Sequence, residues 1–240
     1  EDVRFQDLSS FELCADCAKM GVEVRLIGND AGEKISILPA TIARLDRNAP
    51  DYGRGKYNDF NTFYIQAAAG SSGGSSGSPV IDQQGRVVAL NAGGSRRAAS
   101  SFFLPLHRIE RALRAIQEDL PVTRGTLQTH FTHLPYDEAH RLGLTEESAS
   151  LLRQSFPELD GVLAVKKVNP GGGADGLLLP GDLLIRAEGE AVSDFRDLEA
   201  LLDDKVGQSV QVEVERDGEL LPIKLEVGDL HQITPSSFVQ

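Results

Sequence analysis

One loop carries most of the information in this chain: Gly70-Ser71-Ser72-Gly73-Gly74-Ser75-Ser76-Gly77-Ser78-Pro79-Val80. It joins two short apolar runs, Phe63 to Ala67 before it and Val80-Ile81 after it. Glycine and serine allow the backbone to take positive φ angles and to come close to a ligand. Composition alone favours a flexible connector, but connectors do not normally lie between two short strands. We therefore interpret the stretch as a structured loop between β-strands.

The runs on both sides of this loop have a β pattern, with apolar blocks or alternating residues separated by turns rich in glycine, proline and asparagine. The expected strands cover residues 22–27, 35–38, 41–45, 63–67, 80–82, 87–91 and 102–104. Residues 92–97 look like a second glycine-bearing loop. Short strands at this spacing predict an antiparallel barrel or sandwich. A helical period of apolar residues from Leu106 to Ile116 predicts a helix that closes the unit.

The second half of the chain mixes strands and helices. Leu120 to Gly125 is interpreted as a linker that ends by starting a strand. Asp194 is a plausible N-cap for the helix that follows it. Asp217-Gly218 between two apolar runs predicts a tight hairpin. The expected strands are 161–165, 183–185, 210–214 and 221–227, and the expected helices are 135–144 and 195–202.

Composition describes a globular protein, with 40% hydrophobic and 25% charged residues. The net charge of −12, from 24 Lys+Arg against 36 Asp+Glu, excludes the basic footprint of a nucleic-acid or anionic-membrane protein. Apolar runs are shorter than the roughly 20 residues of a membrane span. The chain begins at Glu1 without methionine, which leads us to expect a fragment or a processed product.

The two cysteines, Cys14 and Cys17, stand in a Cys-x-x-Cys spacing. Such a pair can be redox-active or form half of a zinc site. Because no second pair with ligand spacing accompanies them, we expect two incidental thiols and, from the lack of a disulfide framework, a reducing compartment.

Within the serine-rich loop, Gly74-Ser75-Ser76-Gly77-Ser78-Pro79 resembles the Gly-x-Ser-Gly-x-Pro nucleophile loop of trypsin-like serine proteases, and most closely that of the HtrA/Deg branch. The resemblance implies that Ser76 is the nucleophile and that the N–H groups of Gly74 and Ser76 form the oxyanion hole. Ser72 is a competing serine, but Ser75 follows where the motif has proline.

Further matches extend the resemblance over the first 118 residues. Ile27-Gly28-Asn29, Tyr64-Ile65-Gln66 and Phe102-Phe103-Leu104-Pro105 are similar to family turns and strands. By the same match, the strand edge at Ala92, Gly93 and Gly94 would pair with the substrate backbone, and the loops 68–75 and 92–95 would form the walls of the pocket. The run Asn58 to Thr62 resembles the large, multi-PDZ members of fungi and plants.

The histidines do not follow the family order of His, then Asp, then Ser along the chain. All five, His107, His130, His133, His140 and His231, come after Ser76. Without a base, serine is a poor nucleophile. We therefore expect residues 1–118 to be the C-terminal half of a chymotrypsin-like double β-barrel that is inactive alone, with an exposed apolar face.

Residues 124–230 resemble an HtrA-type PDZ domain of α+β class, after a linker at 119–123 and before a tail at 231–240. The resemblance rests on two stretches. Arg124 to Thr129 is similar to the family sequence Arg-Gly-x-Leu-Gly-Ile, and Leu179 to Ile185 is similar to a family strand entry. The resemblance implies a carboxylate loop at Thr126, Leu127, Gln128 and Thr129 and a groove helix bearing Leu198 and Leu201. Gln128 replaces a family glycine. The alternative that the PDZ fold serves only as a structural brace between domains stays open.

Together these features predict a mainly β chain with the function of an HtrA/Deg-like serine endopeptidase acting on unfolded or damaged proteins. The alternative is a non-catalytic peptide-binding scaffold with a pseudo-protease barrel. No cofactor, metal or nucleic-acid partner is implied; peptide substrates and, for the whole protein, a homo-oligomer are expected. The compartment is not determined, although the family resemblance allows an intracellular site in chloroplast or nucleus.

Overall fold

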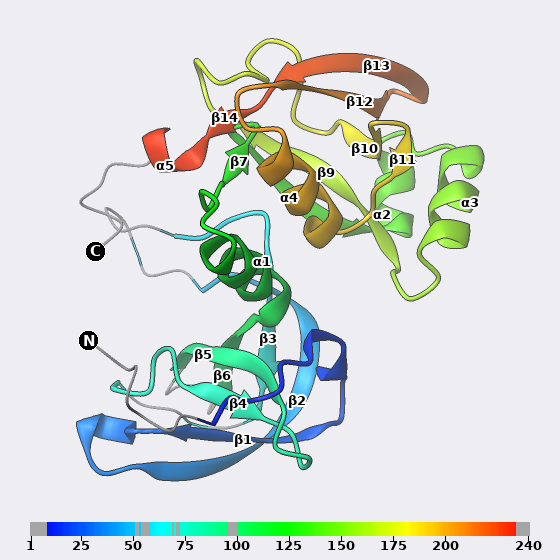
Figure 1. Ribbon diagram of the computed structural model, residues 1–240. Helices are drawn as coiled ribbons and strands as arrows, with labels where there is room; N and C mark the ends of the chain where they lie inside the picture. Colours follow the sequence, from blue (N-terminus) through cyan, green and yellow to red (C-terminus); the bar gives the residue numbers. More distant parts are fainter. Residues whose placement is uncertain are drawn as a thin grey trace. The chain divides into compact units, whose positions relative to one another are not determined.

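The computed structural model describes residues 9–50, 53, 58–68, 70, 73–95 and 100–233, without the side chains of Asp30 and Ser95. Figure 1 shows the helices and strands along the chain. Contacts divide the chain into two compact units. The first unit combines residues 1–50 with 63–120, and the second combines residues 51–62 with 121–240.

The first unit is a closed antiparallel barrel in the order β1-β2-β3-β6-β5-β4. This confirms the prediction of a mainly β barrel. The barrel strands are β1 (Glu23–Gly28), β2 (Ser36–Asn48), β3 (Phe63–Ala67), β4 (Pro79–Ile81), β5 (Val87–Ser95) and β6 (Ser100–Pro105). A short 3-10 turn η2 (Asp30–Gly32) joins the first two strands.

Two of the expected strands, 35–38 and 41–45, are one continuous strand β2. Pro39 lies inside it and pairs with Arg25 of β1. Strand β3 pairs with β2 only from Ile42 onward. Proline is tolerated in a strand where its missing N–H faces an unpaired edge, so Pro39 does not end the strand here.

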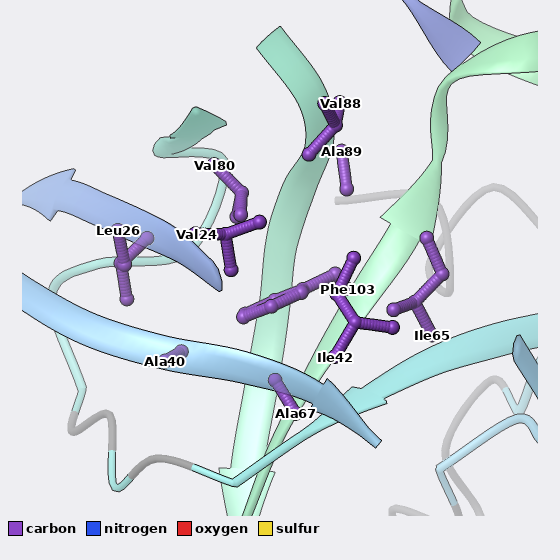
Figure 2. Close-up of a cluster of buried hydrophobic side chains, with 10 residues drawn as sticks. All are labelled: Val24, Leu26, Ala40, Ile42, Ile65, Ala67, Val80, Val88, Ala89 and Phe103. Carbon is purple, nitrogen blue, oxygen red and sulfur yellow. The ribbon is translucent and has the colours of Figure 1, made fainter. Parts of the chain in front are cut away.

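The barrel core is built from small and branched side chains around one aromatic ring (Figure 2). In β1, Val24 and Leu26 are buried while the residues between them are exposed, which is the period of a strand with one face in the core. Phe103 on β6 is completely buried and lies among these side chains (Figure 2). The expected closing helix is α1 (Leu106–Gln117), whose Leu106 is buried.

The segment before β1 lies along β5 and contains the 3-10 turn η1 (Ala15–Cys17). The amide of Cys14 donates to the carbonyl of Val87 at 2.9 Å. A disulfide joins Cys14 and Cys17, so our expectation of two separate thiols is wrong. The 3-10 turn brings the two Cα atoms to 5.3 Å, which lies within the range that a disulfide spans. The argument for a reducing compartment loses its basis.

The second unit is an antiparallel sheet in the order β13-β12-β10-β9-β8, with β11 paired to β10 and a separate pair β14-β7. Its strands are β7 (Gly125–Thr126), β8 (Thr129–Pro135), β9 (Gly161–Val168), β10 (Leu183–Ala187), β11 (Glu190–Ala191), β12 (Ser209–Arg216), β13 (Glu219–Glu226) and β14 (Gly228–Asp229). Its helices are α2 (Tyr136–Arg141), α3 (Glu146–Ser155), α4 (Phe195–Asp204) and α5 (Leu230–Ile233).

Helix α3 was not expected from the sequence. The side chain of Thr145 caps its start by accepting the amide of Ser148, as N-cap threonines do. The buried carboxylate of Glu215 accepts from the backbone and hydroxyl of Thr145 and from the Ser148 hydroxyl. These bonds tie the helix to β12, about 70 residues further along the chain, a partner that no local pattern reveals.

Candidate active site

The serine loop forms a tight turn that presents Ser76 at its corner. The amide of Ser78 donates to the carbonyl of Ser75 at 3.1 Å, which closes a four-residue turn with Ser76 and Gly77 in the middle. Gly77 takes a φ of 80°, the angle that the third position of a type II turn requires. Ser76 is exposed while Ser75 is fully buried. The hydroxyl of Ser76 is therefore carried on the outer side of the loop.

Gly74 precedes this turn in a conformation reserved for glycine, with a φ of 109°. A Cβ atom at this position would lie 2.6 Å from the carbonyl oxygen of Asn29 and 2.6 Å from the nitrogen of Gly32. Within the part of the chain that the structure describes, neither the Gly74 nor the Ser76 amide donates to a backbone carbonyl. The two N–H groups that the resemblance assigns to the oxyanion hole are thus uncommitted, in the sense that they donate to no backbone carbonyl in the described residues.

The end of β1 supports this loop. A Cβ on Gly28 would collide with the side chain of Ser78 and lie 3.3 Å from that of Ser75. This close approach explains why a glycine stands in the Ile27-Gly28-Asn29 turn that resembles the family. The side-chain amide of Asn29 donates to the carbonyl of Glu33 at 2.7 Å and holds the turn below the serine loop.

Asn91 joins the serine loop to β5, and sequence reasoning did not single it out. Its side-chain nitrogen donates to the carbonyl of Ser75 at 2.9 Å, in a buried contact. Its backbone accepts from the amide of Gly77 at 2.7 Å and donates to the carbonyl of Ser78 at 2.9 Å. The three bonds hold the loop on both sides of Ser76.

The residues expected to pair with substrate continue β5. Ala92, Gly93 and Gly94 are strand, so the expectation of a loop beginning at Ala92 is wrong for the described part of that stretch. Gly93 pairs with Phe102 and Gly94 with Ser101. The pairing of β5 with β6 has a register shift between Asn91 and Gly93. Ser72 and the arginines at 96 and 97 lie outside the described residues.

The residues assigned to peptide binding in the second unit divide into two groups. Thr126, Leu127, Thr129 and Leu198 are buried, which makes them part of the packed interior, whereas Gln128 and Leu201 are half-buried. Gln128 has a φ of 53°. This left-handed backbone favours glycine, which explains the glycine of the family motif and shows that the loop keeps its shape with glutamine.

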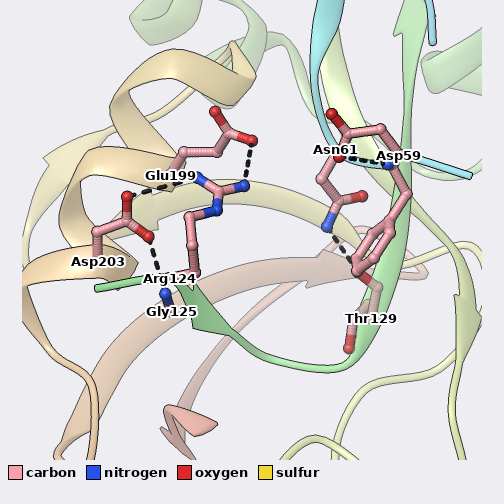
Figure 3. Close-up of polar contacts among 8 residues, drawn as sticks. Asp59, Asn61, Arg124, Gly125, Thr129, Glu199 and Asp203 are labelled. Carbon is pink, nitrogen blue, oxygen red and sulfur yellow. Dashed lines mark hydrogen bonds and ion pairs between the residues drawn. The ribbon is translucent and has the colours of Figure 1, made fainter. Parts of the chain in front are cut away.

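A cluster of charges fixes the start of this loop to helix α4. The guanidinium of Arg124 lies 3.3 Å from a Glu199 oxygen and 3.4 Å from an Asp203 oxygen. The amide of Gly125 donates to the other Asp203 oxygen at 2.8 Å (Figure 3). The amide of Gln128 donates to the Thr126 hydroxyl at 3.0 Å. Two amides in and beside the expected carboxylate loop are therefore already bonded to side chains.

Residues 58–62 contact β8, the edge strand of the second unit. The side-chain nitrogen of Asn61 donates to the carbonyl of Thr129 at 2.7 Å (Figure 3), and its oxygen accepts from the amide of Phe131 at 2.8 Å. The ring of Phe60 stacks on His130 at 4.5 Å between centroids. Burial, followed by the charges of Lys167 and Lys166, lowers the pKa of His130.

Comparisons with known proteins agree with this geometry. A family model described as a trypsin-like peptidase domain matches residues 3–90, and a PDZ domain model matches residues 150–227. The fold and the site therefore define a trypsin-like peptidase unit followed by a PDZ domain. The resemblance of this chain to the HtrA/Deg serine proteases is confirmed by its similarity to proteins of that kind.

Among curated proteins, the chain is 50% identical over 239 residues to the pro-apoptotic serine protease NMA111 of Debaryomyces hansenii, covering all of this chain and 24% of that one. It is 49% identical to Protease Do-like 7 of Arabidopsis thaliana, covering 99% of this chain and 23% of that one. These matches confirm the fungal and plant likeness. The chain spans about a quarter of the length of these relatives.

Among solved structures, the chain is similar to the HtrA-type protease AlgW with tripeptide. The TM-score is 0.64 and the identity 26%, over 93% of this chain and 70% of that one. In the described residues, no helix combines the length and apolar character that crossing a bilayer demands.

Proposed function

We propose that this chain provides the nucleophile of an HtrA-type serine endopeptidase. The observation that supports the proposal is the turn at Ser76, which presents an exposed hydroxyl beside the uncommitted N–H groups of Gly74 and Ser76. In the reaction, the Ser76 Oγ attacks the peptide carbonyl and loses its proton to a base. The carbonyl oxygen becomes an oxyanion that accepts hydrogen bonds from the two amides.

The base and the carboxylate that orients it would come from residues outside this sequence. All five histidines follow Ser76, whereas the fold places the histidine and aspartate before the serine. Unfolded or damaged proteins are the proposed substrates, because an extended segment can pair with the edge of β5 at Ala92 to Gly94.

Ser76→Ala in the whole protein tests the proposal. Cleavage of casein should fall by roughly 10⁴-fold or more, since no other group replaces the nucleophile. A fluorophosphonate probe should label the whole protein, but neither that variant nor the 240-residue chain alone. Ser72→Ala is the matched control and should keep activity. Undiminished cleavage by Ser76→Ala would show that another residue is the nucleophile, and a whole protein that cuts nothing would favour the scaffold alternative.

The PDZ domain offers a second binding surface, and we propose that peptides bind along β8. One edge of β8 is paired with β9, so an added strand must use the other edge, which carries the Thr129 carbonyl and the Phe131 amide. Asn61 occupies both groups in this structure. Peptide binding therefore requires Asn61 to leave.

We further propose that this surface takes internal segments rather than C-termini. Capture of a terminal carboxylate needs backbone N–H donors, and the Gly125 and Gln128 amides are bonded to Asp203 and Thr126. The guanidinium of Arg124 is also already paired with Glu199 and Asp203. Each peptide from a panel should bind equally well with a free or an amidated C-terminus, measured by fluorescence polarisation. A tenfold preference for the free carboxylate would contradict this proposal.

A further inference from the structure

The Asn91 side chain is buried, at 2% exposure, and makes one directed bond. Its nitrogen faces the carbonyl of Ser75 at 2.9 Å. A carbonyl oxygen can only accept, so the amide nitrogen must point towards it and the orientation of the side chain is determined. The amide oxygen of Asn91 is buried and has no hydrogen-bond partner within the described residues. Leaving that acceptor unpaired costs free energy, which a purely structural site would avoid.

The carbonyl of Ser75 and the N–H of Ser76 belong to the same peptide unit. That unit is planar and trans, so its C=O and N–H bonds point in opposite directions. Two donors hold the oxygen end, the Asn91 side chain at 2.9 Å and the Ser78 amide at 3.1 Å. Fixing the oxygen end fixes the direction of the N–H end, away from Asn91.

We propose that Asn91 is a positioning residue that aims the Ser76 N–H at the developing oxyanion. The inference rests on the proposed function, in which that N–H is one of two oxyanion donors. An oxyanion donor must be aimed before the reaction, because turning a peptide unit during the reaction would cost the free energy that the hydrogen bond supplies. Asn91 would keep the Ser76 N–H in this orientation without contacting the substrate.

Substitution of the Asn91 side chain removes its hydrogen bond to the Ser75 carbonyl without removing the backbone bonds of Asn91. The backbone of Asn91 keeps its bonds with Gly77 and Ser78 whatever side chain it carries. Asn91→Asp preserves the shape but replaces the donor with a carboxylate that repels the Ser75 carbonyl. Asn91→Ala removes the donor without introducing a buried charge.

In the whole protein at pH 8, Asn91→Asp should lower kcat for a peptide substrate about 100-fold while KM stays within twofold, as for loss of an oxyanion donor. A peptide aldehyde, which forms a tetrahedral adduct, should lose affinity by a similar factor. Burial raises the pKa of a carboxyl at this position, and the protonated form can donate. The kcat ratio of Asn91→Asp to wild type should therefore rise as pH falls, whereas the ratio for Asn91→Ala should stay constant.

Gln66→Glu is the matched control, because it also changes an amide to a carboxylate in the same barrel, where the new oxygen still accepts from Arg47. It should keep kcat within twofold. If Asn91→Asp unfolds, the Asn91→Ala variant decides. A folded variant with kcat within twofold of wild type, or a change confined to KM, would overturn the inference. Loss of activity in Ser76→Ala together with a neutral Asn91 variant would refute only this inference, whereas full activity in Ser76→Ala would refute the proposed function.

Discussion

Two loops of this chain are assigned by resemblance to the same physical task, which is to hold a negatively charged oxygen with backbone N–H groups. One is the serine loop around Ser76, and the other is the loop Thr126 to Thr129 of the PDZ domain. In the serine loop, glycines occupy the positions of positive φ, at Gly74 and Gly77. In the PDZ loop, Gln128 takes a φ of 53°, so that loop keeps the conformation without the glycine.

The larger difference lies in what the donors already bind. The amides of Gly74 and Ser76 donate to no backbone carbonyl in the described part of the chain. In the PDZ loop, Asp203 accepts from Gly125 and the Thr126 hydroxyl accepts from Gln128. A loop whose backbone has the conformation of an anion site can thus have its N–H donors already bonded to side chains of the same domain. The comparison teaches that an anion site is defined by uncommitted donors as much as by its backbone angles.

The largest effect is expected from Gly74→Ala, which attacks the serine loop at its least tolerant position. The new Cβ would lie 2.6 Å from two backbone atoms of the Asn29 to Gly32 turn, and a φ of 109° is strained for alanine. The backbone must shift and move the Gly74 amide, which is proposed to bind the oxyanion. We expect kcat to fall at least 100-fold, measured with a peptide substrate in the whole protein.

Gly73→Ala is the control for that substitution. A Cβ at Gly73 meets no atom within 4 Å, and its φ is not positive. It should change kcat by less than threefold. Equal losses in both variants would mean that the loop responds to any loss of flexibility, not to the position of the Gly74 amide.

The sequence was informative where the evidence is local. The strand Phe63 to Ala67 has the predicted bounds, and the helix from Leu106 differs by one residue at its end. Asp194 caps α4 by accepting the amide of Asp197. Ser76 could be proposed as the nucleophile because its motif is contiguous. Each of these features depends on residues that are neighbours along the chain.

Other features could not be read from the sequence because they join distant residues. Asn61 reaches β8 across 68 and 70 positions, and Asn91 reaches Ser75 across 16. Asn91 ends the expected strand 87–91, and Asn61 lies in the family-like run Asn58 to Thr62, but neither pattern reveals the distant partner. The error at the Cys14–Cys17 disulfide has a different cause, because these two residues are close in the sequence. Their spacing was recognised, but it was interpreted as two incidental thiols because no second cysteine pair accompanies them.

An intermediate effect is expected from Asn61→Ala, which opens the edge of β8. Each hydrogen bond contributes about 0.5–1.5 kcal/mol net, so removing two should release the Phe131 amide. Its hydrogen exchange should become about tenfold faster or more, as read by NMR. The amide of Val165, which donates to Asp182, should be unchanged. Peptides that bind along β8 should gain about tenfold in affinity, since the competing contact is gone.

Asn58→Ala supplies the comparison within the same segment. The side-chain nitrogen of Asn58 donates to the carbonyl of Gly53 at 3.1 Å, a contact that does not involve β8. The exchange of Phe131 should keep its wild-type rate in this variant. A Phe131 amide that exchanges at the wild-type rate in Asn61→Ala would show that Asn61 does not cover the edge in solution.

The smallest effect is expected from Gln128→Gly, which gives the PDZ loop the glycine of its family. Relief of the left-handed backbone at 53° competes with the greater freedom of glycine in the unfolded chain, so the net gain should be about 0.5–1 kcal/mol. Thermal unfolding should shift upward by a few degrees. Gln211→Gly, in the interior of β12 without a positive φ, should instead lower stability. The substitution should not create a preference for free C-termini, because Asp203 still holds the Gly125 amide; such a preference would mean that backbone shape alone controls carboxylate binding.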